Sequence, residues 1–87
     1  MIKVLISGAL GRMGKKLYDS FALSDKATAV CGVDLKEDIS CPDYPVYASF
    51  ADVKEKVDVV VDFSSPLNLN NVLDFVFNTK IKNVVKV

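Results

Sequence analysis

Three glycines at a spacing of three residues, Gly8, Gly11 and Gly14, follow an apolar run at the start of the chain. Glycine lacks a Cβ, so its backbone N–H group can approach a phosphate closely, and a helix N-terminus favours negative charge. Asp34 stands twenty residues after Gly14, at the end of a second apolar run. This context, more than the GxxGxxG spacing alone, indicates a strand and a helix that bind a dinucleotide. A purely structural turn is the alternative.

Asp34 has the position of the acid that selects the cofactor in such folds. A carboxylate at the end of the second strand can accept both hydroxyls of an adenosine ribose, and it repels a 2′-phosphate. The alternative is an aspartate that only caps the loop. Lys36 lies two residues further on. For this lysine, a contact with phosphate and a merely solvated charge are equal alternatives, so the choice between NADH and NADPH stays open.

Two residues at the predicted start of the first helix are further candidates. The charge of Arg12 opposes the helix dipole, and a bound anion would offset this, which favours a role in ligand binding. Met13 is expected to pack the helix onto the sheet, with its backbone N–H group available to the pyrophosphate.

A third group of candidates follows a run of valines. Asp62 and Ser64 flank Phe63 there. These residues are expected at the edge of the binding crevice, where Asp62 and Ser64 could touch the nicotinamide-ribose end of a cofactor, and Phe63 and Ser64 are the predicted cofactor-binding residues. For Asp62, tying down the turn is the favoured interpretation.

Groups for catalysis or metal binding are not evident in the chain. The sequence contains no histidine, and Cys31 and Cys41 are ten residues apart without a CxxC pair. Neither a zinc site nor a redox motif therefore has its ligands. Cys31 is expected to be a small buried strand residue and Cys41 a loop thiol. The sequence thus predicts a cofactor site without catalytic residues and without a metal.

The apolar pattern predicts strands that alternate with helices. Met13, Leu17 and Phe21 recur at helical spacing and predict a helix that packs through this face. An opening strand is expected before Gly8. Further strands are expected at 27–33, 46–47, 57–63 and 83–87, and an exposed loop at 35–44.

Two more helices are indicated by their capping residues. Ser49 is expected to cap a short helix that ends near Lys56. Ser65 and Pro66 supply an N-cap and a first-turn proline for the next helix. The core face of that helix is predicted to consist of Leu69, Val72, Leu73 and Val76.

These elements predict an α/β fold, a Rossmann-like doubly wound parallel sheet of four to five strands with helices on both faces. The expected strand order is third, second, first, fourth, fifth, with the crevice between the first and fourth strands. Residues 1–87 are expected to form one dinucleotide-binding domain.

The net charge of the chain limits the classes of partner that it can recognise through bulk charge. Eleven basic and eleven acidic residues give a net charge of zero, which argues against nucleic acid or an anionic membrane recognised through bulk charge. No apolar run approaches the length of a membrane span or a secretory signal. The chain is expected to be cytoplasmic.

Two segments give the sequence a family resemblance. Residues 4–14, which include Gly-Arg-Met-Gly, and residues 58–66, which include Asp-Phe-Ser-Ser-Pro, resemble the N-terminal domain of 4-hydroxy-tetrahydrodipicolinate reductase, as does Gly-Val-Asp at 32–34. The resemblance implies a reductase of lysine and diaminopimelate biosynthesis that transfers a hydride from NADH or NADPH to a cyclic unsaturated dicarboxylate. It also implies pyrophosphate binding by Gly8, Ala9, Leu10, Gly11, Arg12 and Met13, and ribose binding by Asp34.

The chain also departs from the family pattern. It lacks the later GTTG segment that contacts the nicotinamide and the stretch that contributes proton transfer and substrate binding. Oligomer contacts of full-length members are therefore expected to be missing as well. Leu10 fills a loop position that is usually small or polar; if it crowds the pyrophosphate, Leu10→Asn is expected to leave the fold intact and to raise the affinity for NADH. Leu67 and Lys86 are further departures.

Three interpretations follow for the function. The chain is the cofactor-binding part of such a reductase, which binds cofactor without catalysis. Alternatively, it is a fragment of another Rossmann dehydrogenase. The third possibility is a non-catalytic interaction module whose last strand, with Val84, Val85 and Val87, adds to another chain.

Overall fold

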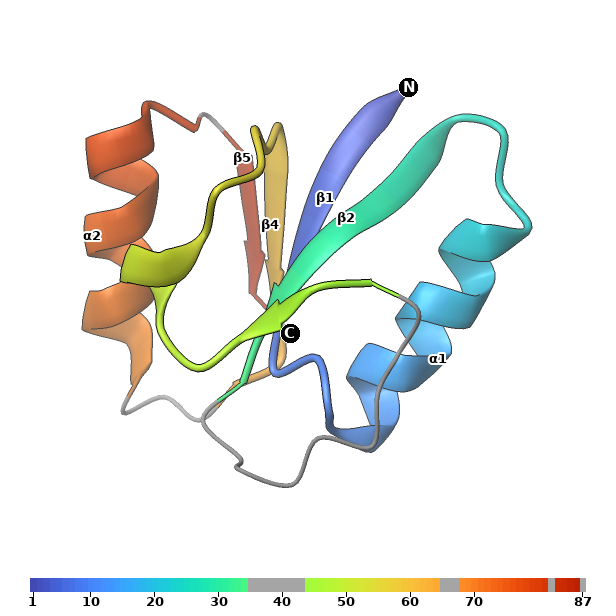
Figure 1. Ribbon diagram of the computed structural model, residues 1–87, viewed down its shortest axis with the longest axis horizontal. Coiled ribbons are helices and arrows are strands. Elements are labelled where there is room, and N and C mark those ends of the chain that lie inside the picture. Colours follow the sequence, from blue (N-terminus) through green and yellow to red (C-terminus); the bar gives the residue numbers. More distant parts are fainter. Residues whose placement is uncertain (35–43, 65–67, 82, 87) are drawn as a thin grey trace.

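The computed structural model describes residues 1–34, 44–64, 68–81 and 83–86, and shows a parallel sheet between two helices (Figure 1). The described part of the chain forms five strands in the order β3-β2-β1-β4-β5, all paired in parallel. The predicted fold class and strand order are therefore confirmed. The elements are β1 (Ile2–Ser7), α1 (Arg12–Ala22), β2 (Ala27–Val33), β3 (Val46–Tyr47), the 3-10 helix η1 (Phe50–Asp52), β4 (Val59–Asp62), α2 (Leu69–Thr79) and β5 (Asn83–Lys86).

Each face of the sheet has its own apolar core, because successive side chains of a strand point to opposite faces. Along β1, Val4 and Ile6 pack with Leu17 and Phe21 of α1. Leu5 packs on the other face, which α2 and η1 cover, with a set of buried residues formed by Cys31, Val33, Val60, Val72 and Ile81. Figure 1 shows α1 and α2 on opposite sides of the sheet. The sheet is therefore covered on both faces, as a doubly wound fold requires.

The first turn of α1 does not pack as predicted. Met13 is 52% exposed, so the expectation that its side chain packs the helix onto the sheet is wrong. The buried residue of this turn is Gly14. A Cβ on Gly14 would collide with the carbonyl oxygen of Gly8. The start of α1 therefore lies against the loop backbone itself, and that close contact leaves no room for a side chain.

The core face of α2 also differs from the predicted one. Val72 is fully buried, but Leu69 and Leu73 are 39% and 49% exposed. Phe75 packs instead, with its ring 5.1 Å from the ring of Phe50 in η1. Together with this contact between η1 and α2, the helix is oriented so that residues 72, 75 and 76 face the core. The predicted cap and first-turn proline, Ser65 and Pro66, lie outside the described residues.

The helix between β3 and β4 is shorter than predicted. The hydroxyl of Ser49 accepts a hydrogen bond from the N–H group of Ala51 at 3.2 Å, which confirms the predicted cap. The helix ends at Asp52, not near Lys56, because Val53 turns to an extended conformation and packs against the core.

The fourth strand begins at Val59, two residues later than expected. The Asp58 carboxylate accepts a hydrogen bond from the N–H group of Lys3 at 2.9 Å. The side chain thus takes the place of a strand carbonyl and sets the start of the ladder.

Cys31 is fully buried in β2, as predicted. Burial and the nearby charge of Glu55 raise the pKa of its thiol to about 12. Cys41 and residues 35–43 of the expected exposed loop at 35–44 lie outside the described residues, as does Val87. Tyr44, the last residue of that loop, is half-buried, because its ring stacks on the ring of Tyr18 at 4.3 Å. Within the described ranges, no helix is both long enough and apolar enough to span a membrane.

Candidate functional site

The carboxyl ends of three neighbouring strands meet at the glycine loop that joins β1 to α1. In the sheet register, Ser7 at the end of β1 stands between Val33 of β2 and Asp62 of β4. The chain turns at this point into Gly8, and α1 begins at Arg12. The structure thus brings together the loop, Asp34 and the turn after β4, as the order of strands predicted.

The loop is held in place by the end of β2. The carbonyl oxygen of Val33 accepts hydrogen bonds from the N–H groups of Gly8, at 2.8 Å, and Ala9, at 3.4 Å. The Asp34 carboxylate accepts a third, from the N–H group of Leu10, at 2.8 Å. Asp34 is half-buried, and through this hydrogen bond it caps the loop. Loop capping was the alternative interpretation of Asp34. The hydrogen bond to Leu10 leaves the predicted contact between Asp34 and a ribose untested.

Two of the loop glycines are required by the fold itself. Gly8 has a φ of +86°, which residues with a Cβ rarely adopt. A Cβ there would also lie 3.2 Å from the backbone of Phe63 and Ser64. At Gly14, a Cβ would lie 2.8 Å from the carbonyl oxygen of Ala9. These two residues let the loop lie directly against β4 and α1.

Gly11 is different, because the described part of the fold does not require a glycine there. Its φ and ψ of −77° and 171° suit any residue. Among the described residues, a Cβ would make one ordinary contact, 3.4 Å from the carbonyl oxygen of Gly8. The glycine at this N-cap is therefore not explained by packing within the described residues.

The residues around the N-terminus of α1 are compatible with a bound anion. Gly11 is the N-cap and provides no side chain to bond the first N–H groups of α1. The first turn contains no acidic residue, although acidic residues are favoured there by the helix dipole. Arg12 and Met13 are exposed beside it. The helix end therefore has positive character and N–H groups without a capping side chain.

Ala9 and Leu10 face inward. Their side chains are 1% and 7% exposed, and the proximity of Leu10 to a pyrophosphate stays a prediction. The N–H group of Leu10 donates a hydrogen bond to Asp34, so the backbone of this residue is also engaged within the protein.

A hydrogen-bond chain joins the end of β4 to the start of α2. Asp62, although fully buried, accepts hydrogen bonds from both the N–H group and the hydroxyl of Ser64. The amide of Asn68 donates to the Ser64 hydroxyl at 3.3 Å, and the amide of Asn71 donates to Asn68 at 2.8 Å. Asp62 thus ties down the turn, as favoured from the sequence. Phe63 lies in the same turn, between Asp62 and Ser64.

Sequence reasoning missed the two asparagines and Gly32. Asn68 and Asn71 have the helical spacing of three residues, which was the available signal. A Cβ on Gly32 would lie 2.5 Å from the Cβ of Ala9 and 3.2 Å from the hydroxyl oxygen of Tyr44. A glycine inside a buried strand indicates such a close approach. Of the predicted site residues, Lys36 lies outside the described part of the chain.

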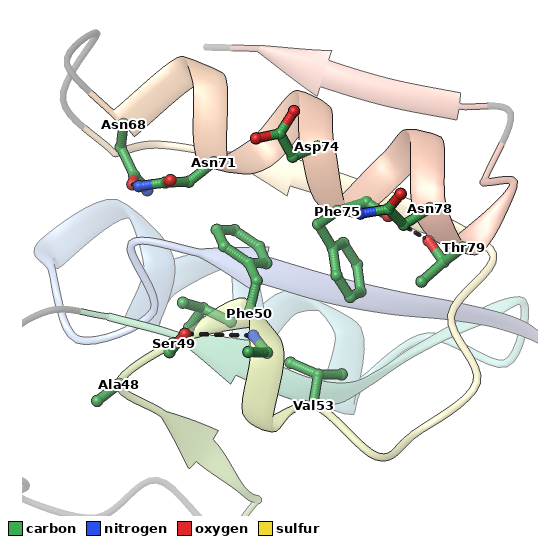
Figure 2. A pocket seen from close by; sticks show the side chains of 12 residues that line it. Ala48, Ser49, Phe50, Val53, Asn68, Asn71, Asp74, Phe75, Asn78 and Thr79 are labelled. Atoms are coloured by element: carbon green, nitrogen blue, oxygen red, sulfur yellow. Dashed lines mark hydrogen bonds between the residues drawn. The ribbon is translucent and has the colours of Figure 1, made fainter.

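A cavity of about 600 Å³ lies between η1 and α2, on the face of the sheet opposite α1. Figure 2 shows Phe50 and Phe75 in it, with Asn68, Asn71 and Asn78 along α2. Val33 and Asn68 also belong to its lining, so the cavity adjoins the residues that hold the glycine loop. Among the described residues, no group of three or more histidine, cysteine, aspartate or glutamate side chains could hold a metal ion.

Comparison with known proteins decides the family. Residues 2–86 match the family model described as "Dihydrodipicolinate reductase, N-terminus". The chain belongs to the dihydrodipicolinate reductase family. It is 35% identical over 75 residues to the 4-hydroxy-tetrahydrodipicolinate reductase of Clostridium novyi (strain NT), which covers 86% of this chain and 29% of that protein. The enzyme of the same name from Caldanaerobacter subterraneus subsp. tengcongensis is 34% identical over 85 residues, 98% of this chain and 33% of the relative.

A solved structure supports the fold of this family member. It is the dipicolinate-bound dihydrodipicolinate reductase from Paenisporosarcina sp. TG-14, with a TM-score of 0.83 at 20% identity. That match covers 100% of this chain and 37% of the other. The chain therefore spans about a third of the length of the relatives it matches. The family resemblance seen in the sequence is confirmed, and a fragment of an unrelated dehydrogenase is excluded.

Proposed function

We propose that this chain binds NADH or NADPH at the carboxyl ends of β1, β2 and β4. The pyrophosphate lies over the loop from Gly8 to Met13, where the N-terminus of α1 provides N–H groups and positive character. Arg12, exposed beside this helix end, adds a cation. The observation that carries the proposal is Gly11, where a Cβ would make only one ordinary contact with the described residues, so the fold they form does not itself require a glycine at this N-cap.

In this proposal the other residues bind the remaining parts of the cofactor. Asp34 accepts hydrogen bonds from the adenosine ribose while it holds Leu10, and Lys36 follows it in the sequence. The apolar cavity that begins at Val33 offers a wall for the adenine. Phe63 and Ser64 border the nicotinamide-ribose end, because their backbone lies against Gly8.

We further propose that the chain is the cofactor-binding part of a 4-hydroxy-tetrahydrodipicolinate reductase. The bound nicotinamide supplies a hydride for a cyclic unsaturated dicarboxylate. These 87 residues include no histidine, and we assign none of them to proton transfer. The chain by itself binds the cofactor and does not turn over substrate. We place the protein in the cytoplasm, within lysine and diaminopimelate biosynthesis, without a nucleic-acid or membrane partner.

Calorimetric titration with NADH and NADPH tests the binding proposal. The wild-type chain is expected to bind at least one of them. Gly11→Ala is expected to weaken binding about tenfold, equivalent to about 1.4 kcal/mol. Its Cβ makes only an ordinary contact within the fold, so the variant stays folded, with a loss of about 1 kcal/mol or less from the N-cap.

The same titration also defines failure. A folded wild-type chain that gives no heat with either nucleotide overturns the binding proposal. If Gly11→Ala binds as tightly as the wild type, the pyrophosphate does not lie over this loop. Thermal unfolding of both proteins under the same conditions separates lost binding from lost structure.

A further inference from the structure

The cavity between η1 and α2 combines amide side chains with aromatic rings. Figure 2 shows the side chains of Asn68 and Asn71 pointing toward one another, and Phe50 projecting from η1 toward α2. The ring centre of Phe75 lies 5.1 Å from that of Phe50. The cavity volume of about 600 Å³ falls within the range of small-molecule sites, about 300 to 1,000 Å³. Because bases stack on aromatic side chains, the cavity suits a flat heterocyclic ring.

The charge of the described cavity lining favours a neutral group over an anion. Asp74 is the one charged residue in it, and no lysine or arginine of the described chain contributes to the lining. A phosphate in the cavity would therefore meet no opposite charge. Val33 also belongs to the lining, and the next residue, Asp34, is the proposed contact of the adenosine ribose. A base attached to that ribose therefore lies beside the cavity, while the phosphates stay at the glycine loop.

The hydrogen bonds between β4 and α2 fix the direction in which the amides point. As a carboxylate, Asp62 can only accept hydrogen bonds, so the Ser64 hydroxyl donates its one proton to it. The Ser64 oxygen then accepts, from the amide nitrogen of Asn68 at 3.3 Å. The carbonyl oxygen of Asn68 is its remaining group, and it accepts from the amide nitrogen of Asn71 at 2.8 Å. Each orientation in this chain therefore follows from the one before it.

This order leaves the carbonyl oxygen of Asn71 as an acceptor in the cavity lining. The amide nitrogen of Asn71 faces Asn68, and the oxygen has no hydrogen-bond partner in the part of the chain that the structure describes. A half-turn of this amide would place its oxygen against the oxygen of Asn68, so that two acceptors would meet. Asn68 is 8% exposed, whereas Asn71 is exposed. Asn71 is therefore the member of the pair that a ligand in the cavity can contact.

We infer that Asn71 selects adenine over a 6-oxopurine, because its carbonyl oxygen accepts a hydrogen bond from the exocyclic amino group of the base. This role of Asn71 rests on the cofactor site proposed above. Hypoxanthine has an oxygen in place of the amino group and would set two acceptors against each other. A site that bonds an N–H group discriminates against an analogue without it, since its own polar group is then left unpaired. Asn68 is a positioning residue, which acts through Asn71 and does not touch the base.

Calorimetry with a pair of nucleotides tests the role of Asn71. NADH or NADPH, whichever the chain binds, is compared with its hypoxanthine analogue, in which an oxygen replaces the amino group of the base. The wild-type chain is expected to bind the adenine form about tenfold more tightly. Asn71→Ala removes the acceptor, and Asn68→Ala frees the Asn71 amide to rotate, so the two affinities become nearly equal in both variants. A loss of stability alone would weaken both nucleotides alike and leave their ratio unchanged.

Asn70→Ala is the matched control, because Asn70 is exposed on the same helix and does not belong to the described cavity lining. This variant makes the same change of residue type and is expected to keep the wild-type ratio of affinities. Equal wild-type binding of the two bases, or a ratio that survives in Asn71→Ala, overturns the role of Asn71 and leaves the proposed cofactor site standing. A ratio that survives in Asn68→Ala overturns the positioning role. A folded wild type that binds no nucleotide overturns the cofactor site and the role of Asn71 together.

Discussion

The Asp34 carboxylate accepts a hydrogen bond from the N–H group of Leu10 at 2.8 Å, across the gap between the end of β2 and the glycine loop. Asp34 therefore has a structural role, because it holds the glycine loop through this hydrogen bond whether or not a ligand is bound. It joins the residue proposed to select the cofactor to the loop proposed to bind the pyrophosphate. A substitution at Asp34 can thus act through charge or through the position of the loop, and suitable variants separate the two.

Asp34→Asn is expected to change cofactor preference with little effect on the loop. Asparagine retains an oxygen that can accept from Leu10 but removes the charge that repels a 2′-phosphate. The affinity for NADPH relative to NADH is expected to rise about tenfold, equivalent to about 1.4 kcal/mol. Asp34→Ala also loses the hydrogen bond and is expected to weaken both nucleotides. Equal behaviour of the two variants in calorimetry would show that this hydrogen bond does not position the loop.

Gly14→Ala is expected to destabilise the chain, although alanine favours helices by about 1 kcal/mol over glycine. The added Cβ would collide with the carbonyl oxygen of Gly8 and crowd that of Ala9. Because backbone must move, we expect a net loss of about 2 to 4 kcal/mol in urea unfolding. Gly11→Ala is the matched control, since its Cβ meets only one ordinary contact. A Gly14→Ala variant as stable as that control would contradict the described contact between α1 and the loop.

The strand order was predictable because it depends on local signals and a general rule. Runs of β-branched residues mark the strands, and right-handed crossovers then determine their neighbours. The orientation of α2 was not predictable in the same way. Two overlapping apolar faces occur on it, one with Leu69 and Leu73 and one with Val72 and Phe75. The choice between them depends on Phe50, which comes from a distant segment.

In the candidate site too, features set by local sequence were predicted, and features set by distant residues were not. The glycine loop and Asp34 were found from spacing, because the strand and helix around them are regular. The hydrogen bond from the N–H group of Leu10 to Asp34 was not found, because it joins residues 24 positions apart. Gly32 was missed for a similar reason. Its need for a bare backbone comes from Ala9, which belongs to another element.

Cys31 is expected to make the chain less stable in alkali. Its thiol has a pKa of about 12 in the fold, against 9.0 as the ordinary value. Between these values the unfolded chain releases a proton that the folded chain keeps, so stability present below pH 9 is lost as the pH rises toward 12. Cys31→Ala is expected to reduce this loss, measured by urea unfolding at several pH values. An unchanged slope would contradict the raised pKa of this thiol.

The same burial predicts a protected thiol. In a Cys41→Ser background, iodoacetamide is expected to modify Cys31 only on unfolding, because the thiolate is the reactive form and Cys31 is fully buried. Rapid modification of the folded protein would show that β2 opens at this position.

Asp62 is expected to be the most important acidic residue for the stability of the crevice. Its buried carboxylate accepts from the N–H group and the hydroxyl of Ser64, and this turn lies against Gly8. Asp62→Ala removes the acceptor for both donors, and hydrogen bonds to charged groups contribute about 1.5 to 3 kcal/mol each. We expect a loss of about 3 kcal/mol in urea unfolding. Asp62→Asn keeps an acceptor oxygen and is expected to lose less.

Asp58→Ala provides the comparison for Asp62. Asp58 is exposed and accepts one hydrogen bond, from the N–H group of Lys3, so its removal is expected to cost about 1 kcal/mol or less. The difference between the two alanine variants therefore measures what burial adds to a carboxylate that bonds backbone. If Asp62→Ala loses no more stability than Asp58→Ala, the chain from Asp62 through Ser64 to Asn68 does not hold the turn. Weaker NADH binding by Asp62→Asn, at unchanged stability, would extend its role from the fold to the proposed cofactor site.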